Sequence, residues 1–333
     1  MADASIGAEE EFTMARFFIA LLAALAAIPA AAQYPAQFPD RPVTLLAGYP
    51  PGGLVDLVAR LVAEGMKSKL PKGLNVVNRP GAAGALAVAE MTRSQPDGYT
   101  VVLTPHSALV IAAQMQDLAY KTPDDYDPFV NLVSYYPMIA VRTESEYKTI
   151  NDLVADAKGN PGKLRVGSPG EGTSSHLNLE EFMHHTGTKM VHVPFQGWAQ
   201  SSAAVLGGHI DAVVAQPGEL RGAVDGKRVR VLVNFRPARL NSFADVPTAK
   251  ELGWDVANGV WYMLLAPKGT PAAVTRYLHD AAKAAVEDPK FAADMANRGI
   301  DVDYRPGPTL RNDLWREYKV HTDILRRIGM LKK

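Results

Sequence analysis

The sequence predicts a two-lobed α/β protein in which each lobe is a mostly parallel sheet flanked by helices. Three observations carry this prediction. The chain has 333 residues, 47% of them hydrophobic, which is enough for about two domains with ample cores. Short apolar runs alternate with helical patterns from residue 43 onward, and the same alternation starts again at residue 164. Alternating strands and helices are typical of parallel sheets.

The expected first lobe comprises residues 33–140 together with 258–333. Its first half is expected to contain strands at 43–47, 75–78 and 99–103, and helices at 57–70 and 82–94. Residues 117–131 are acidic and contain prolines, which predicts a surface loop. The apolar stretch 133–141 is expected to carry the chain into the second lobe.

The expected second lobe comprises residues 141–257. Its predicted elements are a helix at 150–158, a strand at 164–167, a helix at 176–186, a strand at 190–193, a helix at 200–206, and strands at 210–215 and 229–235. A strand at 260–266 is expected to return the chain to the first lobe. Helices are then predicted at 271–286, 289–298 and 309–328, with an extended segment at 300–304.

The N-terminus predicts export. Met14-Ala15-Arg16 is a short basic start, residues 17–28 are apolar, and Ala30-Ala31-Ala32 is typical of a cleavage site. We therefore expect an N-terminal extension and signal peptide over residues 1–32, cleavage near Ala32, and a mature protein in the periplasm. The acidic residues 1–13 precede a better start at Met14 and are expected to reflect a mis-assigned start codon.

Charge and composition exclude several classes of function. The chain has 35 basic and 35 acidic residues and no dense basic patch, so nucleic acid is not an expected partner. The absence of cysteine excludes disulfides, cysteine–zinc sites and cysteine nucleophiles.

A glycine-rich turn, Gly48 to Asp56, lies between the first predicted strand and the first predicted helix. Glycines let a ligand approach the backbone, and the free N–H groups of a first helical turn suit an anion. The turn lacks both G-x-G-x-x-G and the Lys-Ser/Thr ending of a P-loop, so it is not a nucleotide signature. A plain connection that needs glycine for its dihedral angles remains the alternative.

Unusual loops follow four predicted strands directly, at 52–53, 104–107, 168–175 and 195–198. In open α/β sheets, ligands bind at the carboxyl ends of strands, so two facing lobes would form a cleft rich in N–H groups and hydroxyls. Such a cleft suits a carboxylate. The alternative is that these residues only cap helices. The expected ligand-binding residues are Tyr49, Gly52, Gly53, Thr104, His106, Ser107, Ser168, Gly172, Thr173, Ser174, Phe195, Gln196, Gly197 and Trp198.

Catalytic interpretations have less support. Gly167-Ser168-Pro169-Gly170 is one residue short of the G-x-S-x-G elbow, and Ser168 has no evident base in the sequence. His176, Glu180 and His184 would share a helix face and are zinc-ligand types, which leaves an exported metal-dependent hydrolase as an alternative. That helix is polar all round, so a solvated face is simpler, and we expect no metal and no cofactor.

Other polar and aromatic residues have structural and functional interpretations. Asp56 and Arg60 are expected to form a helix-supporting pair. Trp198 and, less strongly, Trp261 are candidates for cleft walls, although aromatic residues are more often core. Arg79 follows the second strand and suits either a ligand carboxylate or a structural ion pair.

Motifs along nearly the whole mature chain carry a family resemblance. They are, in order, Phe38 to Val43, Pro51-Gly52-Gly53 with Asp56 and Ala59-Arg60, Asn78 to Gly84, Pro96 to Thr100, Gly170 to Leu177, Leu206 to Asp211, Asp245 to Thr248, Glu251-Leu252-Gly253 and Ala266 to Pro271. With these motifs the chain resembles the Bug-type periplasmic solute-binding receptors of tripartite tricarboxylate transporters.

The resemblance implies a type II periplasmic-binding-protein fold that closes like a Venus flytrap on a small carboxylate. It implies a non-enzymatic receptor, expected to be a monomer, whose partners are small and large membrane permease subunits. A periplasmic sensor input would use the same cleft and remains an alternative. The family often has Tyr where Phe195 stands and a small residue where Trp198 stands. An aromatic acid is therefore as acceptable a ligand as a di- or tricarboxylate.

Overall fold

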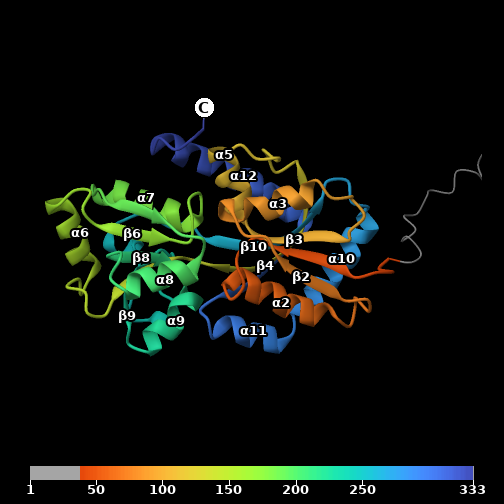
Figure 1. Ribbon diagram of the computed structural model, residues 1–333, viewed down its shortest axis with the longest axis horizontal. Helices are drawn as coiled ribbons and strands as arrows, with labels where there is room; N and C mark the ends of the chain where they lie inside the picture. The colour runs from red at the N-terminus through yellow and green to blue at the C-terminus, as the bar shows by residue number, and fades with distance from the viewer. Residues whose placement is uncertain (1–37, 333) are drawn as a thin grey trace, which may run out of the picture. The chain divides into compact units, whose positions relative to one another are not determined.

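The computed structural model describes residues 38–332. The extension and signal peptide predicted for residues 1–32 lie outside the described residues. Residues Pro39–Lys333 form one compact unit with two mixed β-sheets and flanking helices (Figure 1). None of the helices in the described part of the chain combines the length and apolar character needed to cross a bilayer.

The first sheet has six strands in the order β11-β4-β10-β3-β1-β2. Its strands are β1 (Val43–Ala47), β2 (Leu74–Asn78), β3 (Thr100–Pro105), β4 (Tyr126–Tyr135), β10 (Val260–Pro267) and β11 (Asp301–Pro306). Helices α3, α5 and α12 lie on one side of this sheet, and α2 and α11 lie on the other (Figure 1). The associated helices are α2 (Leu54–Met66), α3 (Ala85–Thr92), α4 (His106–Val110), α5 (Ala112–Met115), α10 (Ala272–Val286), α11 (Pro289–Ala296) and α12 (Gly307–Arg327).

The second sheet has five strands in the order β7-β6-β8-β5-β9. Its strands are β5 (Met138–Arg142), β6 (Arg165–Ser168), β7 (Val191–Pro194), β8 (Ala212–Ala215) and β9 (Val229–Asn234). Its helices are α6 (Ile150–Gly159), α7 (Ser174–Thr186), α8 (Trp198–Leu206) and α9 (Pro217–Asp225). Short 3-10 turns occur at Ala82–Gly84, Asn241–Phe243 and Lys250–Leu252.

The second sheet is buried on both faces, and strand β5 shows how. Successive strand residues point to opposite faces. Ile139 and Val141 accordingly belong to the core beneath α6 and α7, whereas Met138 and Ala140 belong to the core beneath α8 and α9. Because helices cover both faces of this sheet, its strands are continuous apolar runs in the sequence. Most of them could therefore be predicted.

Both sheets are mixed: most strands of each sheet run in one direction, as predicted, and a few run against them. Strand β1 pairs in parallel with β2 and β3, but β10 is antiparallel to both β3 and β4. Strand β6 pairs in parallel with β7 and β8, but β5 is antiparallel to β8 and β9. The reversed strands are β5 and β10, where the chain enters a new sheet, and β11 at the edge of the first sheet; periodicity alone does not report strand direction.

The predicted apolar stretch 133–141 is two strands in two sheets. Strand β4 ends at Tyr135 and β5 begins at Met138, with Pro137 between them. Proline has no N–H to donate to a ladder, so it marks the break. The chain returns to the first sheet at Val260, where the sequence predicted a return strand.

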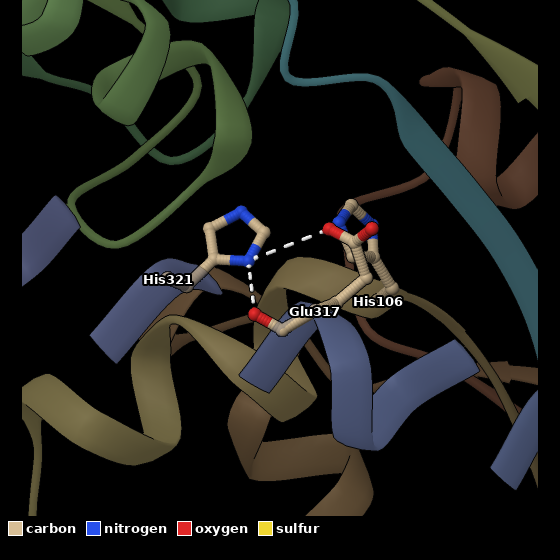
Figure 2. Close-up of side chains that lie close together, drawn as sticks. All are labelled: His106, Glu317 and His321. Atoms are coloured by element: carbon tan, nitrogen blue, oxygen red, sulfur yellow. Dashed lines mark hydrogen bonds and ion pairs between the residues drawn. The ribbon is translucent and has the colours of Figure 1, made fainter. Parts of the chain in front are cut away.

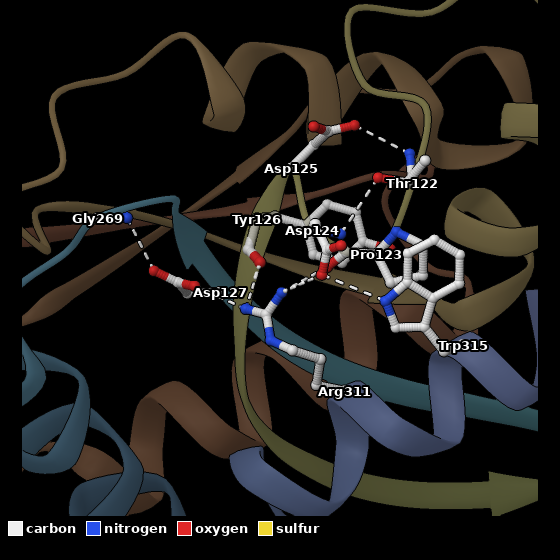
Figure 3. Close-up of polar contacts among 9 residues, drawn as sticks. All are labelled: Thr122, Pro123, Asp124, Asp125, Tyr126, Asp127, Gly269, Arg311 and Trp315. Atoms are coloured by element: carbon white, nitrogen blue, oxygen red, sulfur yellow. Dashed lines mark hydrogen bonds and ion pairs between the residues drawn. The ribbon is translucent and has the colours of Figure 1, made fainter.

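The predicted surface loop at 117–131 is wrong from Tyr126 onward, where β4 begins. Two of its acidic residues, Asp124 and Asp127, instead hold Arg311 of α12 (Figure 3). Arg311 donates to Asp127 Oδ1 at 2.7 Å, to Asp124 Oδ1 at 3.2 Å and to the Tyr126 carbonyl at 2.9 Å. The acidic character of this segment therefore reflects an ion-pair cluster that fastens β4 to α12.

Helix α2 positions the glycine-rich turn because it packs tightly against α10. A Cβ added at Gly65 would lie 2.5 Å from the Ala285 Cβ, so only glycine permits this approach. Val58 and Val62 on the same helix are fully buried. Burying each valine contributes roughly 1.5–3 kcal/mol. The helix start at Leu54 is thereby fixed relative to the first sheet.

Candidate ligand-binding site

A cavity of about 140 Å³ lies between loops of the two sheets. Elements of the first sheet contribute Tyr49, Pro50, Pro51, Gly53, Leu54, Val55, Pro105, Ser107, Tyr135, Val260 and Tyr262. Elements of the second sheet contribute Pro169, Thr173, Ser174, Ser175, Gln196, Gly197, Trp198, Ala199, Gln200, Gln216 and Glu219. This volume suits a small molecule rather than a polymer.

The first turns of four helices line this cavity, namely those of α2, α7, α8 and α9. A helix N-terminus presents unpaired N–H groups and a partial positive charge. Among the described residues, no lysine, arginine or histidine lines the cavity. The arrangement therefore favours an anion through backbone dipoles and hydroxyls rather than through a full positive charge.

The Gly52–Gly53 turn is held in shape by Asp56. Gly52 has a φ of +86°, which glycine adopts without strain, and its N–H donates to Asp56 Oδ2 at 3.0 Å. Asn78 donates to the other oxygen of the same carboxylate at 3.0 Å, and Arg60 pairs with it at 2.9 Å. The expected Asp56–Arg60 pair is thus confirmed, and it belongs to a larger network that holds the turn.

The pKa of Asp56 lies below its ordinary value. Burial pushes this pKa upward, but hydrogen bonds from Arg60, the Gly52 N–H and Asn78 outweigh burial. The carboxylate is therefore ionised at neutral pH and is committed to the turn and not to a ligand.

The loop before α7 offers hydroxyls. Thr173 caps the helix, since its Oγ1 accepts from the His176 N–H at 3.2 Å and donates to the Gly170 carbonyl at 2.7 Å. Ser174 Oγ is buried and has no hydrogen-bond partner among the described residues, and Ser174 lines the cavity. A buried hydroxyl without a partner is costly, so a ligand atom is its natural partner.

Ser168 is not a cavity residue, and the structure shows what it bonds. Its Oγ lies 2.7 Å from His192 Nε2 and donates to the Gly170 carbonyl at 3.0 Å. A carbonyl oxygen can only accept, so Nε2–H of His192 donates to Ser168 Oγ. The imidazole therefore does not take the serine proton, and this pair does not form an activated nucleophile.

The histidine behind this loop is neutral. Burial, with a smaller contribution from the neighbouring His176, lowers the pKa of His192 to about 3. The two rings stack with centroids 3.7 Å apart. The loop is therefore supported from behind by two stacked imidazole rings, of which that of His192 is neutral.

The structure brings most of the predicted residues to one place. Those that line the cavity are Tyr49, Gly53, Ser107, Thr173, Ser174, Gln196, Gly197 and Trp198. Phe195 instead lines a second cavity of about 320 Å³, which shares Tyr49, Pro50, Pro169 and Gln196 with the first. Its walls include Ala82 and Ala83, both in the left-handed region with φ of 48° and 55°.

Five predicted residues line neither cavity: Gly52, Thr104, His106, Ser168 and Gly172. Gly52 shapes the turn. Thr104 is fully buried, and its Oγ1 bonds the Pro105 carbonyl. Gly172 donates its N–H to His176 Nδ1 at 3.2 Å. Gly52, Thr104, Ser168 and Gly172 therefore hold the loops in shape through hydrogen bonds and do not line the cavity.

Sequence reasoning missed Gln216 and Glu219 of α9 and Tyr135 and Tyr262 of the central strands. The two tyrosine hydroxyls lie 3.2 Å apart, and that of Tyr262 donates to Gln216 Oε1 at 3.3 Å. A usable signal existed for α9, since Gln216-Pro217-Gly218 also follows a predicted strand directly. The tyrosines carried no such signal, because they look like ordinary strand residues.

The comparisons with known proteins agree with this geometry. The family model described as the tripartite tricarboxylate transporter family receptor (TctC) matches residues 58–326. The chain belongs to this receptor family. A protein of Cupriavidus necator, the "UPF0065 protein in gbd 5'region", is 34% identical over 92% of this chain and 93% of its own length.

Solved structures support the same assignment. The periplasmic binding protein BugD is 26% identical and superposes with a TM-score of 0.83, covering 89% of this chain and all of its own. MatC from Rhodopseudomonas palustris, solved with bound malate, is 26% identical with a TM-score of 0.81, covering 86% of this chain and all of its own. The predicted two-lobed fold and the Bug-type resemblance are confirmed.

The metal hypothesis placed on α7 of the receptor does not fit the structure. His176 and Glu180 lie 3.5 Å apart, but His176 Nδ1 already accepts from Gly172, and His184 is exposed on another part of the helix surface. The predicted solvated face is also wrong, because Asn178 and Glu181 are buried. Both make contacts with Asn258, which precedes the return strand.

A different cluster, His106, Glu317 and His321, has ligand-type atoms within 4.8 Å of one another (Figure 2). His106 Nδ1 accepts from the Trp261 N–H at 3.3 Å, and His321 Nδ1 bonds the Glu317 carbonyl at 2.7 Å. Burial, then His321, and then the positively charged Arg305 guanidinium lower the pKa of His106. A divalent cation would meet this positive charge, so we interpret the cluster as packing behind Ser107.

The receptor's two candidate wall tryptophans differ in role. Trp198 begins α8 and lines the cavity. Trp261 does not line it, because its ring is stacked between His106, at 4.9 Å, and the Arg305 guanidinium, at 3.9 Å. Arg79, left open by the sequence, pairs with Glu90 at 2.9 Å.

Proposed function

We propose that this receptor captures a small organic carboxylate in the periplasm and presents it to the small and large membrane permease subunits of a tripartite tricarboxylate transporter. One observation carries the proposal: four helix N-termini meet in one small cavity with the Ser174 hydroxyl, which has no partner among residues 38–332, and no basic residue of this range lines the cavity. MatC, a relative with the same fold, was solved with malate, which supports a carboxylate ligand.

In the proposed binding mode, one ligand carboxylate sits at the start of α2, beside Gly53, and the other end meets Thr173 and Ser174. Backbone N–H groups and the Ser174 hydroxyl then supply the hydrogen bonds that a carboxylate needs. Trp198 closes the side of the cavity and offers a flat face to an aromatic or extended ligand.

We propose lobes of residues 33–140 with 258–333 and of 141–257, closing about the two crossover segments. Sheet membership supports this division and moves the first crossover to residues 136–137. Elements of the two sheets are joined by ion pairs between Arg236 and Asp301, at 2.6 Å, and between Arg327 and Glu181. A ligand that contacts both sides of the cavity favours the closed arrangement and shifts the equilibrium toward it.

Export supports the location of the proposed function. The signal-peptide pattern ending near Ala32 would direct the chain to the periplasm. Sequencing the N-terminus of protein purified from the periplasm tests this part directly. A start at Gln33 is expected, and a mature chain that begins before Met14 would contradict it.

A thermal-shift screen tests the ligand class. Protein purified from the periplasm is incubated with malate, succinate, citrate, glutamate and benzoate, each with and without EDTA. A ligand at 100 times its Kd stabilises the folded state by about 2.7 kcal/mol, which is an easily measured shift. We expect at least one carboxylate to raise the Tm regardless of EDTA. Shifts that require added metal, or none with any carboxylate, would overturn the proposal.

A further inference from the structure

Glu219 is the one residue with a charge-bearing side chain that lines the cavity in the described part of the chain. It lies in the first turn of α9, in the second sheet's half of the wall. Its Oε1 is 4.0 Å from the position that a Cβ on Gly53 would take, so it reaches across to the turn at the start of α2. An acid thus stands where the helix dipoles favour an anion.

The surroundings of Glu219 hold the carboxyl in its neutral form. Burial raises the pKa of Glu219 to about 8, although hydrogen bonds from the Gln216 side chain and from the backbone of Leu54 and Gln216 oppose this. The titratable groups that face it are Tyr49, Tyr135 and Tyr262, and their pKa values are raised above the ordinary tyrosine value, mainly by burial. All three remain neutral hydroxyls over the range in which Glu219 titrates.

A neutral carboxyl has two complementary ends. Its carbonyl oxygen accepts a hydrogen bond, and its O–H donates one. The accepting end meets N–H groups of Gln216 and the Leu54 N–H at the start of α2. The donating end then has the cavity as its natural direction. A carboxylate ligand supplies an acceptor there, and a hydrogen bond of this type is short and strong.

We propose that Glu219 is a ligand-binding residue that acts in its protonated form, accepting from the Leu54 N–H and donating to a ligand carboxylate. This inference rests on the proposed function and sharpens it. An ionised Glu219 would repel the ligand across a few ångströms of low-dielectric space. Binding of one carboxylate therefore requires one proton on Glu219. At any pH at which the side chain of the free protein is ionised, the protein takes up this proton from solution when the ligand binds.

The proposal fixes the sign of the pH dependence. Below pH 7 the free carboxyl already carries its proton, so affinity is constant and no proton is taken up. Above the pKa of about 8, each further pH unit weakens binding about tenfold, because a smaller fraction of the protein is in the binding form. Between pH 6.5 and 9.5 the expected loss of affinity is about thirtyfold.

Isothermal titration calorimetry at pH 6.5 and 9.5 tests this, with sodium malate and sodium benzoate as probes. Carboxyls of this kind titrate near pH 4, so both probes are fully ionised throughout the range. Repeating the pH 9.5 titration in two buffers of different ionisation enthalpy gives the number of protons taken up. We expect a value close to one at pH 9.5 and close to zero at pH 6.5.

Three variants separate Glu219 from other groups. Glu219→Gln keeps the shape and a donating N–H, so it is expected to bind equally at both pH values and to take up no proton. Glu219→Ala is expected to bind at least about fivefold more weakly at pH 6.5, because a hydrogen bond to a charged group is lost. Glu144→Gln alters an exposed glutamate and is expected to retain the wild-type pH dependence.

Each outcome decides a different claim. Binding of malate or benzoate that is unchanged or tighter at pH 9.5 would overturn this inference, because neither probe carries a cationic group that could pair with an ionised Glu219, and it would leave the receptor function intact. The inference also fails if Glu219→Gln keeps the wild-type pH dependence. If neither probe nor any other screened carboxylate binds at either pH, the proposed function itself fails.

Discussion

The turn at Gly52–Gly53 and the loop at Ser168–Ser175 face the same cavity but are built from different groups. The first offers backbone N–H groups and is held by a carboxylate, Asp56, bound to Arg60 and Asn78. The second offers hydroxyls and is held by a serine bonded to a neutral histidine. The turn is therefore held by a network of charged side chains, and the loop is held by neutral side chains.

The comparison separates residues that face a ligand from residues that hold a wall. Gly53 and Ser174 face the cavity, whereas Asp56 and Ser168 stand behind it. Substitutions at the first pair should change affinity, and substitutions at the second pair should change stability. Acid should weaken the two walls through different groups. The following predictions test that separation.

The largest effect on affinity is expected from Gly53→Val. Gly53 has ordinary extended dihedrals, and its nearest neighbours to an added Cβ are the Pro50 carbonyl at 3.8 Å and Glu219 at 4.0 Å. Alanine therefore fits with little effect, but the branches of valine enter the ligand space. Overpacking of this kind costs about 1–3 kcal/mol, and calorimetry should show a loss of affinity of about tenfold or more.

Gly52→Ala is the matched control for the turn. Its Cβ would meet nothing within 4 Å, but its φ of +86° strains an alanine. We expect a loss of about 1 kcal/mol in the free energy of unfolding, with a smaller change in affinity than in Gly53→Val. If both variants alter affinity equally, the turn acts through its shape and Gly53 is not a contact.

Asp56→Asn should destabilise the fold by about 1–3 kcal/mol, because a buried carboxylate with three partners is replaced. Urea unfolding measures this. Glu64→Gln removes an exposed partner of Lys67 on the same helix and should change stability by less than about 0.5 kcal/mol. An equal effect of the two substitutions would show that the network does not hold the turn.

Ser174→Ala should weaken carboxylate binding by about five- to tenfold, the value of one hydrogen bond to a charged group, and leave the Tm nearly unchanged. Ser168→Ala, in the same loop, should lower the Tm and affect affinity less. The reverse pattern would exchange the roles assigned to the two serines.

Acid should destabilise the protein through two buried histidines, His192 and His321. Burial lowers the pKa of His321, behind Ser107, to about 4, and that of His192 to about 3. The unfolded chain binds these protons below about pH 6.5, so the stability is complete above that pH and is lost as pH falls toward the folded values. Each histidine contributes a loss of up to about 1.4 kcal/mol per pH unit.

Urea unfolding between pH 7 and 4.5 measures this effect. His321→Gln and His192→Gln should each reduce the slope of stability with pH, whereas His184→Gln, at an exposed position, should not. A slope that neither buried substitution changes would assign the acid sensitivity to other groups.

Much of the site could be predicted, because loops that follow buried strands share one edge of a sheet. That rule led to Gly53, Ser174 and Trp198, which line the cavity. It could not tell which member of a polar loop faces inward, since that depends on Thr173 capping α7 and on Ser168 meeting a histidine 24 residues away. The same rule did not lead to Glu219, because an isolated glutamate on a helix usually faces solvent.

The fold was predicted best where strands are continuous apolar runs and worst where polar residues carry tertiary contacts. Strand β4 was missed because Asp127 and Pro128 look like loop residues, yet Asp127 is bound by Arg311. The reversed strands were not predicted, because the periodicity of apolar residues indicates burial and does not indicate the direction in which a strand runs. The crossover at Pro137 was placed only to within a few residues.

A crystal structure of the receptor with a bound carboxylate tests the central claim most directly. The account predicts one carboxylate at the start of α2, between Gly53 and Glu219, with Ser174 Oγ within hydrogen-bond distance of the ligand and no metal ion at the site. A ligand found in the second cavity beside Ala82 and Ala83, or one held by a metal ion, would contradict it.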